Sequence, residues 1–237
     1  GGADLHSYQP SAKDMAKISS ADMFVYVGGS SDAWVFDAVR ETVNKNMKKV
    51  NMMELLGDRA KEEEVVEGMQ DDEHGHSHTA SEDSHGEHEE TDEIEYDEHI
   101  WTSLENAQLL VSAIEEIFCE ADPEHEKQFR DNAAAYREQI ADVQSEIEEI
   151  VDNARVKKIL FADRFPFLYF TQEFGLDYDA AFAGCAGDTE PSARVIASLI
   201  EEIQSENIKA IYHVEMGNTK TAQMIQEATG VEILELH

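Results

Sequence analysis

The sequence predicts an α/β protein with two lobes, each built on a parallel sheet, that are joined by one long helix. Two observations lead to this fold class. Short apolar segments typical of buried strands alternate with helical segments in both halves of the chain, an order that favours parallel sheets. Between the halves, residues 124–153 keep helical periodicity over a length sufficient to span two lobes. We expect an N-terminal lobe at 1–121, the linking helix at 122–154 and a C-terminal lobe at 155–237.

The N-terminal half contains two pairs of helix and strand. The first helix is expected at 11–20, where Ser11 is a favoured N-cap residue and an aspartate follows in the first turns. The apolar run 23–27, which ends at two glycines, predicts a buried strand. A second helix is expected at about 33–44, followed by a short strand or extended segment at about 50–55.

The second half of the chain continues the alternation. Helical periodicity covers 102–119, breaks at Asp122 and Pro123, and resumes in the linking helix. Gly175 and Gly230 stand where helix C-caps are expected. The predicted strands are 158–162, 178–183, 210–214 and 231–237, and the predicted helices between them are 166–174, 191–206 and 218–229.

The composition excludes several classes of partner. The chain carries 52 acidic and 18 basic residues, a formal net charge of −34, and such a surface repels nucleic acids and anionic lipids. Cys119 and Cys185 are too few for a disulfide framework.

No segment approaches the roughly 20 apolar residues of a membrane span. Because the chain opens on Gly1 without Met and stops as a strand finishes, we expect both lobes to be partial.

Residues 62–98 form an acidic, histidine-rich segment. They contain seventeen acidic residues and no lysine or arginine, and too little apolar surface to order themselves, which predicts a disordered loop. The loop is either a solvated linker or a metal-collecting segment, because neutral imidazoles along a flexible acidic chain exchange zinc weakly and quickly. Its five histidines are His74, His76, His78, His85 and His88.

Three other histidines lie at loop or strand ends, namely His6, His99 and His237. Ligands in α/β folds collect at the carboxyl ends of strands, so these side chains are placed to converge between the lobes. Spacing alone leaves a surface or core role open for each of them. By contrast, His125 is expected to be exposed on the long helix, and His213 to lie within a strand.

Two of these histidines stand in distinctive segments. Gly2–Pro10 follows the pattern Gly-x-x-x-His-x-Tyr-x-Pro, and Asp97–Trp101 follows Asp-x-His-x-Trp and opens the helices that lead to the long helix. The acidic loop comes directly before the second segment. In this order, the segments resemble those of the zinc- and manganese-binding solute-binding proteins of bacterial ABC importers. The resemblance implies two α/β lobes joined by a long helix, with the metal held in the cleft between them.

The resemblance also implies a set of site residues, from which this sequence departs at one position. Arg164 occupies the place of the family's usual third histidine, and a guanidinium stays protonated and cannot bind a cation. Asp163 or Glu190 would neutralise it, and Glu215 lies at a strand end that is also familiar in the family. His237 falls where the family has its fourth ligand and would restore the lost imidazole.

The implied ligands are therefore His6, His99 and His237, and the implied cargo is zinc rather than manganese. Three nitrogen ligands completed by a carboxylate or water suit zinc, whereas manganese favours more oxygen ligands. The implied function is capture of the ion outside the cytoplasm, in the periplasm or on a lipid anchor at the outer face of the cytoplasmic membrane. A monomer would deliver the ion to a membrane permease without a catalytic step.

Two alternatives remain open at this point. One is an extracellular metal-buffering protein or adhesin, in which the acidic loop or surface contacts would carry the function. The other is a zinc-dependent hydrolase, since three histidine ligands with an open position can activate water. The sequence argues against the hydrolase because it contains no His-Glu-x-x-His helix.

Overall fold

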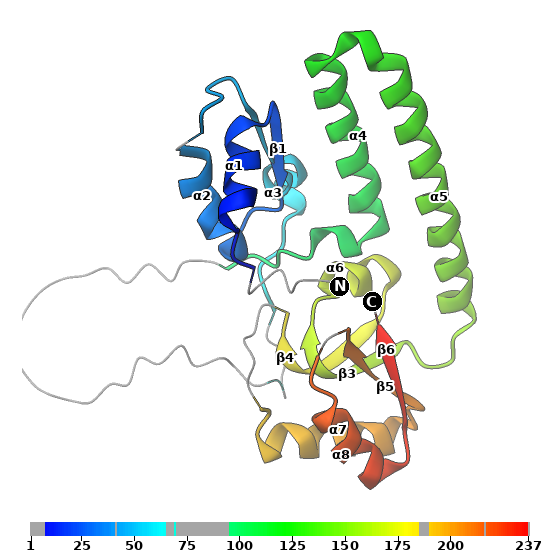
Figure 1. Cartoon of the computed structure of the whole chain (residues 1–237). Coiled ribbons are helices and arrows are strands. Elements are labelled where there is room, and N and C mark those ends of the chain that lie inside the picture. The colour runs from blue at the N-terminus through cyan, green and yellow to red at the C-terminus, as the bar shows by residue number, and fades with distance from the viewer. Residues whose placement is uncertain are drawn as a thin grey trace, which may run out of the picture.

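Two α/β lobes joined by a long helix make up the protein, as the sequence predicts (Figure 1). In Figure 1 the N-terminal lobe and helix α4 lie above helix α6 and the C-terminal sheet lies below it, while α5 runs along one side from the level of α4 to that of the sheet. The structure is a computed structural model that describes residues 8–40, 42–64, 69, 95–184, 190–215 and 217–236.

The N-terminal lobe is built on a two-stranded parallel sheet. Its elements are α1 (Ala12–Ser20), β1 (Met23–Tyr26), η2 (Ser30–Asp32), α2 (Ala33–Arg40), β2 (Lys48–Asn51), α3 (Met52–Leu56) and η3 (Gly57–Arg59). The two strands pair with Val25 opposite Val50. Helix α1 begins where predicted, because Ser11 and Asp14 form a capping box that satisfies backbone N–H groups at its start.

The short strand or extended segment predicted at about 50–55 is wrong in its position, because the strand lies at 48–51 and a helix follows it. Strand β2 ends at Asn51, whose side chain caps α3 by accepting the backbone N–H of Glu54 at 3.2 Å. The apolar residues that follow therefore form a short helix, and Leu56 packs in a buried cluster with Ile100.

A pair of helices leads from the first lobe to the second. They are α4 (Leu104–Ala121) and α5 (Glu126–Asn153), with the short turns η4 (Ile100–Thr102) before them and η5 (Pro123–His125) between them. The break predicted at Asp122 and Pro123 is confirmed. Buried Glu115 of α4 accepts hydrogen bonds from Arg130 and Arg137 of α5, which tie the two helices together. None of the helices described combines the length and apolar content needed to cross a membrane.

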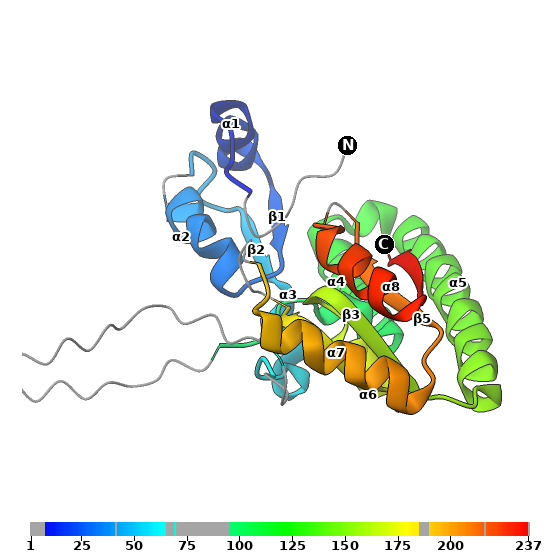
Figure 2. The same cartoon turned by 90° about the horizontal axis from the view of Figure 1, so that it is seen from below.

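The C-terminal lobe is a four-stranded parallel sheet in the order β4-β3-β5-β6. Its elements are β3 (Lys158–Phe165), α6 (Leu168–Phe174), β4 (Asp177–Ala183), α7 (Ala193–Glu206), β5 (Ala210–Val214), α8 (Lys220–Thr229) and β6 (Glu232–Leu236). Helices α7 and α8 cover one face (Figure 2), where Leu160 and Ile211 pack against Leu199 and Ile225. Helices α6 and α8 end at glycines in the left-handed conformation, as predicted for residues 175 and 230.

The acidic loop expected at 62–98 is structured at both of its ends. Glu62 and Tyr96 form an antiparallel bridge, and Asp97 and Glu98 are only 1% and 4% exposed. The chain segments that precede and follow the histidine-rich stretch therefore lie side by side. The five histidines of that stretch fall outside the residues that the structure describes.

Candidate metal centre

His99 is buried between the lobes, and Asp97 holds its imidazole. Asp97 Oδ1 accepts the backbone N–H of His99 at 2.7 Å and lies 2.9 Å from the ring Nδ1. A carboxylate only accepts hydrogen bonds, so Nδ1 is the nitrogen that donates to Asp97, and in the neutral imidazole this leaves Nε2 as the nitrogen able to bind a metal ion. The two side chains are 9% and 2% exposed. This is the arrangement by which a carboxylate orients a metal-binding histidine.

The C-terminal lobe approaches the His99 ring closely. A Cβ added to Gly184, the residue after β4, would lie 3.4 Å from His99 Nδ1 and 2.8 Å from the carbonyl oxygen of Phe165 at the end of β3. A larger residue would push the ring or the strand end away, since backbone can come this near only where there is no side chain. Gly184 thus lets the carboxyl ends of β3 and β4 meet the imidazole.

The strand order places a topological switch point beside this histidine. Strand β3 has β4 on one side and β5 on the other, and ligands of α/β sheets bind outside the carboxyl ends of strands at such a point. The carboxylate of Asp163 fills the space that a side chain at Gly217, just beyond β5, would need. Glu215 also follows β5, and its backbone N–H donates to the carbonyl oxygen of Leu236 at 3.0 Å. The predicted accessory residues Asp163 and Glu215 therefore lie at this edge of the sheet.

Arg164 stands at the same edge. It lies next to the last residue of β3, opposite Phe182 of β4, and its backbone N–H donates to Asp163 Oδ1 at 2.8 Å. That Arg164 replaces a ligand stays a prediction.

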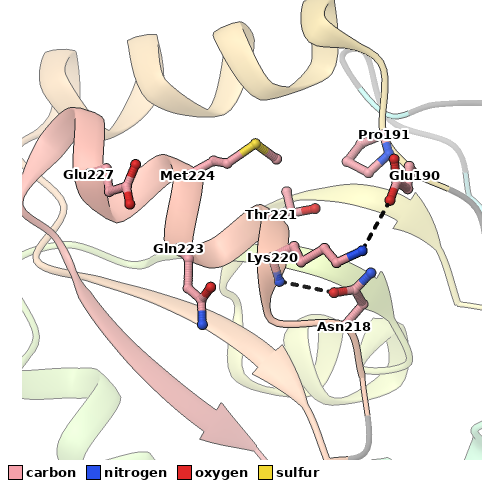
Figure 3. A pocket seen from close by; sticks show the side chains of 8 residues that line it. All are labelled: Glu190, Pro191, Asn218, Lys220, Thr221, Gln223, Met224 and Glu227. Carbon is pink, nitrogen blue, oxygen red and sulfur yellow. Dashed lines mark hydrogen bonds and ion pairs between the residues drawn. The ribbon is translucent and has the colours of Figure 1, made fainter.

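Glu190, the other candidate for neutralising Arg164, lines a pocket between the starts of α7 and α8 (Figure 3). Glu190 Oε1 lies 3.6 Å from Lys220 Nζ, and both side chains are largely exposed. Its ion pair is thus with Lys220, and a role beside Arg164 stays a prediction. The pocket has a volume of about 340 Å³ and is lined by Glu190, Pro191, Asn218, Lys220, Thr221, Gln223, Met224 and Glu227.

Two of the three predicted ligands, His6 and His237, lie outside the described residues, as does Cys185. Within the part of the chain that the structure does describe, no three or more histidine, cysteine, aspartate or glutamate side chains are grouped to hold a metal ion. The ligand set inferred from the resemblance therefore stays a prediction. Of its three histidines, the structure describes His99 alone.

The two histidines to which the sequence assigned no metal role lie as expected. His125 is 58% exposed, and its Nδ1 lies 2.7 Å from Asp122 Oδ2. His213 is buried within β5, where its Nδ1 lies 3.0 Å from the carbonyl oxygen of Val214.

The sequence alone did not indicate a role for Asp97. The residue belongs to the segment Asp97–Trp101, but only the histidine of that segment was assigned a function. A usable signal was present, because an aspartate can hydrogen-bond to the backbone two residues further on and so fix the residue there. The structure shows that bond and adds the contact with the ring.

Comparisons with known proteins identify the family of the chain. The family model described as "Zinc-uptake complex component A periplasmic" matches residues 1–237. Zinc-binding lipoprotein AdcA of Streptococcus pneumoniae R6 is 31% identical over 231 residues, which are 98% of this chain and 42% of AdcA. High-affinity zinc uptake system protein ZnuA of Bacillus subtilis is 28% identical over 227 residues, 96% of this chain and 66% of ZnuA. The chain therefore spans less than half the length of AdcA.

Solved structures show the same fold. The Zn(II)-bound ZnuA-like domain of Streptococcus pneumoniae AdcA matches with a TM-score of 0.69 and 26% identity, over 100% of this chain and 76% of that domain's chain. A crystal structure of ZnuA matches with a TM-score of 0.74 and 21% identity, over 98% of this chain and 78% of that one. Because the family model spans residues 1–237, the chain belongs to the family described as zinc-uptake complex component A, periplasmic.

Proposed function

We propose that this chain captures zinc as the solute-binding component of an ABC importer and delivers the ion to a membrane permease. The observation that carries the proposal is the buried pair of Asp97 and His99, which lies between the lobes against the carboxyl ends of β3 and β4. Membership of the zinc-uptake family supports zinc as the cargo. The names of the relatives, one of them a lipoprotein, support a location outside the cytoplasm.

Capture in this proposal is binding without chemistry. His6, His99 and His237 supply imidazole nitrogens, and a carboxylate or water completes a tetrahedral shell, which suits zinc better than manganese. Asp97 orients the His99 ring before the ion arrives, so little ordering remains to be done on binding. The histidines of the acidic loop collect zinc weakly and pass it on.

A zinc titration tests the proposal. Residues 65–94 are replaced by a short Gly-Ser linker, which removes the loop histidines and keeps the bridge between Glu62 and Tyr96. In this background, calorimetry should show one tight zinc site that is weakened at least about 100-fold by His99→Ala, because the variant loses a ligand. The matched control is His125→Ala, which removes an exposed histidine that is also paired with an aspartate.

The outcomes separate the possible functions. Loss of the tight site in His99→Ala but not in His125→Ala supports interlobe capture. If deletion of the loop removes nearly all zinc binding, the protein is a metal buffer and the proposed site is wrong. A parallel manganese titration decides the cargo, since a zinc carrier should bind manganese much more weakly at a nitrogen-rich site.

A further inference from the structure

The two chain segments that flank the acidic loop run side by side. These segments, residues 61–63 and 95–97, are called the neck below. Glu62 and Tyr96 are partners in an antiparallel bridge, and the residues next to them make backbone hydrogen bonds of 2.9 Å across the neck. His99 follows two residues after the second segment. The geometry of the neck therefore bears on the position of the proposed ligand.

Tyr169 of α6 inserts its hydroxyl group into this ladder. The hydroxyl accepts the backbone N–H of Lys61 at 2.9 Å and donates to the carbonyl oxygen of Asp97 at 2.8 Å. The N–H of Asp97 donates in turn to the carbonyl oxygen of Lys61 at 2.9 Å, so the three residues close a ring of hydrogen bonds. In a regular antiparallel pair, the N–H of Lys61 would bond directly to the carbonyl of Asp97. The hydroxyl group has taken the place of that bond.

The Tyr169 side of this ring of hydrogen bonds is buried, and its bond with the exposed Lys61 is half-buried. Tyr169 is 2% exposed, and its side chain packs in the buried cluster that contains Leu56, Ile100 and Leu110. Removing the hydroxyl would leave the N–H of Lys61 and the carbonyl of Asp97 without the partner they share, which is costly in a buried setting. The backbone of Asp97 is therefore expected to shift, together with the carboxylate that holds the His99 ring.

We propose that Tyr169 is a positioning residue for zinc capture: its hydroxyl fixes Asp97, and Asp97 fixes the imidazole of His99. The inference rests on the proposed function, because it matters only if His99 binds the ion. It gives a residue of the C-terminal lobe control over a ligand carried by the N-terminal lobe. It also makes the closed neck, rather than the loop that it supports, a structural part of the site.

The first test is Tyr169→Phe in the full chain. Phenylalanine keeps the ring that fills the buried cluster and removes only the hydroxyl. Zinc affinity is measured by competition with a chromogenic chelator strong enough to report the tightest site alone, and we expect it to fall about 10-fold, as for the loss of a partner that orients a ligand. The matched control is Tyr178→Phe, whose hydroxyl donates to Glu64 at 3.1 Å beside the neck and not to Asp97; its affinity should stay within about twofold of the parent.

A double-mutant cycle distinguishes positioning from a general loosening of the fold. In an Asp97→Ala background the connection between Tyr169 and His99 is already cut, so Tyr169→Phe should weaken zinc binding no further. An equal loss in both backgrounds, or an affinity of Tyr169→Phe within twofold of the parent, would overturn the inference. His99→Ala serves as the reference: unchanged binding in that variant refutes the proposed function itself, whereas weakened binding there with no effect of Tyr169→Phe removes only this inference.

Discussion

Lys158 holds three carboxylates at the amino end of the C-terminal sheet, away from the candidate centre. Its Nζ lies 2.6 Å from Asp179 Oδ2, 2.6 Å from Glu202 Oε2 and 3.6 Å from Glu206 Oε1. Burial alone would lower the pKa of Lys158, but the hydrogen bonds to Asp179 and Glu202 outweigh burial and raise it. Burial raises the pKa of Glu202, and its hydrogen bond with Asp179 raises it further, while Lys158 opposes both effects.

Lys158→Met should therefore destabilise the protein in a pH-dependent way. A carboxyl group whose pKa rises on folding stabilises the fold below its ordinary pKa of about 4.3 and loses that contribution as the pH increases. Without the ammonium group, the pKa of Glu202 rises further and this loss becomes steeper. Urea unfolding should show a decrease of about 3 kcal/mol in the unfolding free energy at pH 8, and a clearly smaller decrease at pH 5.

The control for this substitution is Lys127→Met on α5. The Lys127 side chain is 87% exposed and pairs with Asp131 one turn away, an arrangement that contributes little to stability. The variant should unfold like the parent at both pH values. A loss of stability in Lys158→Met that is equal at pH 5 and pH 8 would contradict the interpretation of Glu202.

Among the secondary-structure elements, three helices meet at one carboxylate. Ser103 caps α4 by accepting the backbone N–H of Asn106 at 3.1 Å, and its hydroxyl donates to Glu173 Oε2 of α6 at 2.5 Å. Glu173 Oε1 accepts the side-chain N–H of Gln144 in α5 at 2.9 Å. The start of α4 is therefore fixed both to the linking helix and to the C-terminal lobe.

Ser103→Ala should cost about 1–2 kcal/mol of unfolding free energy, because it removes the cap and the bond to Glu173 together. The matched control is Ser11→Ala, which removes the exposed cap of α1 and should cost about 1 kcal/mol or less. Chemical unfolding of both variants measures the difference. If Ser103→Ala is no more destabilising than Ser11→Ala, the contact with Glu173 does not contribute to joining the lobes.

Local interactions made most elements predictable. Ser11, Gly175 and Gly230 mark helix ends in the sequence itself, and all three predictions are confirmed. Asn51 caps α3 just as locally. The prediction failed there because a short apolar run has no periodicity that distinguishes a buried strand from one or two turns of helix.

The candidate site was predictable only in part, because its contacts join distant residues. His99 stands out in its segment, and the sequence placed it between the lobes. Tyr169 and Asp97 are 72 positions apart, and the approach of Gly184 to His99 depends equally on how the lobes meet. The fold brings these residues together through the packing of α6, and no local pattern reports that packing.

The whole molecule carries far more negative than positive charge, 52 acidic against 18 basic residues. Repulsion among like charges opposes the compact state, and salt screens it. The same field draws cations toward the surface, which suits a protein that captures a metal ion. The attraction comes from the total charge and does not depend on any single residue.

Raising NaCl from about 0.02 M to about 0.5 M should therefore increase the melting temperature by several degrees, since screening shortens the range of repulsion from roughly 20 Å to roughly 4 Å. The variant without residues 65–94 loses eleven carboxylates and no basic residue, so its formal net charge changes from −34 to −23. The melting temperature of this variant should therefore increase less with NaCl than that of the parent. Scanning calorimetry of both proteins decides, and a melting temperature that does not respond to NaCl would rule out net repulsion as a destabilising effect.

The neck also makes the protein an accessible scaffold for engineering. Because Glu62 and Tyr96 are bridge partners, the two ends of the segment between them lie side by side, as the insertion of a foreign domain requires. Lengthening such a loop costs only about 0.6 kcal/mol for each doubling, so its length can change without straining either lobe. A fluorescent reporter spliced between residues 64 and 95 would sit next to the segment that carries His99 and could turn occupancy of the site into an optical signal.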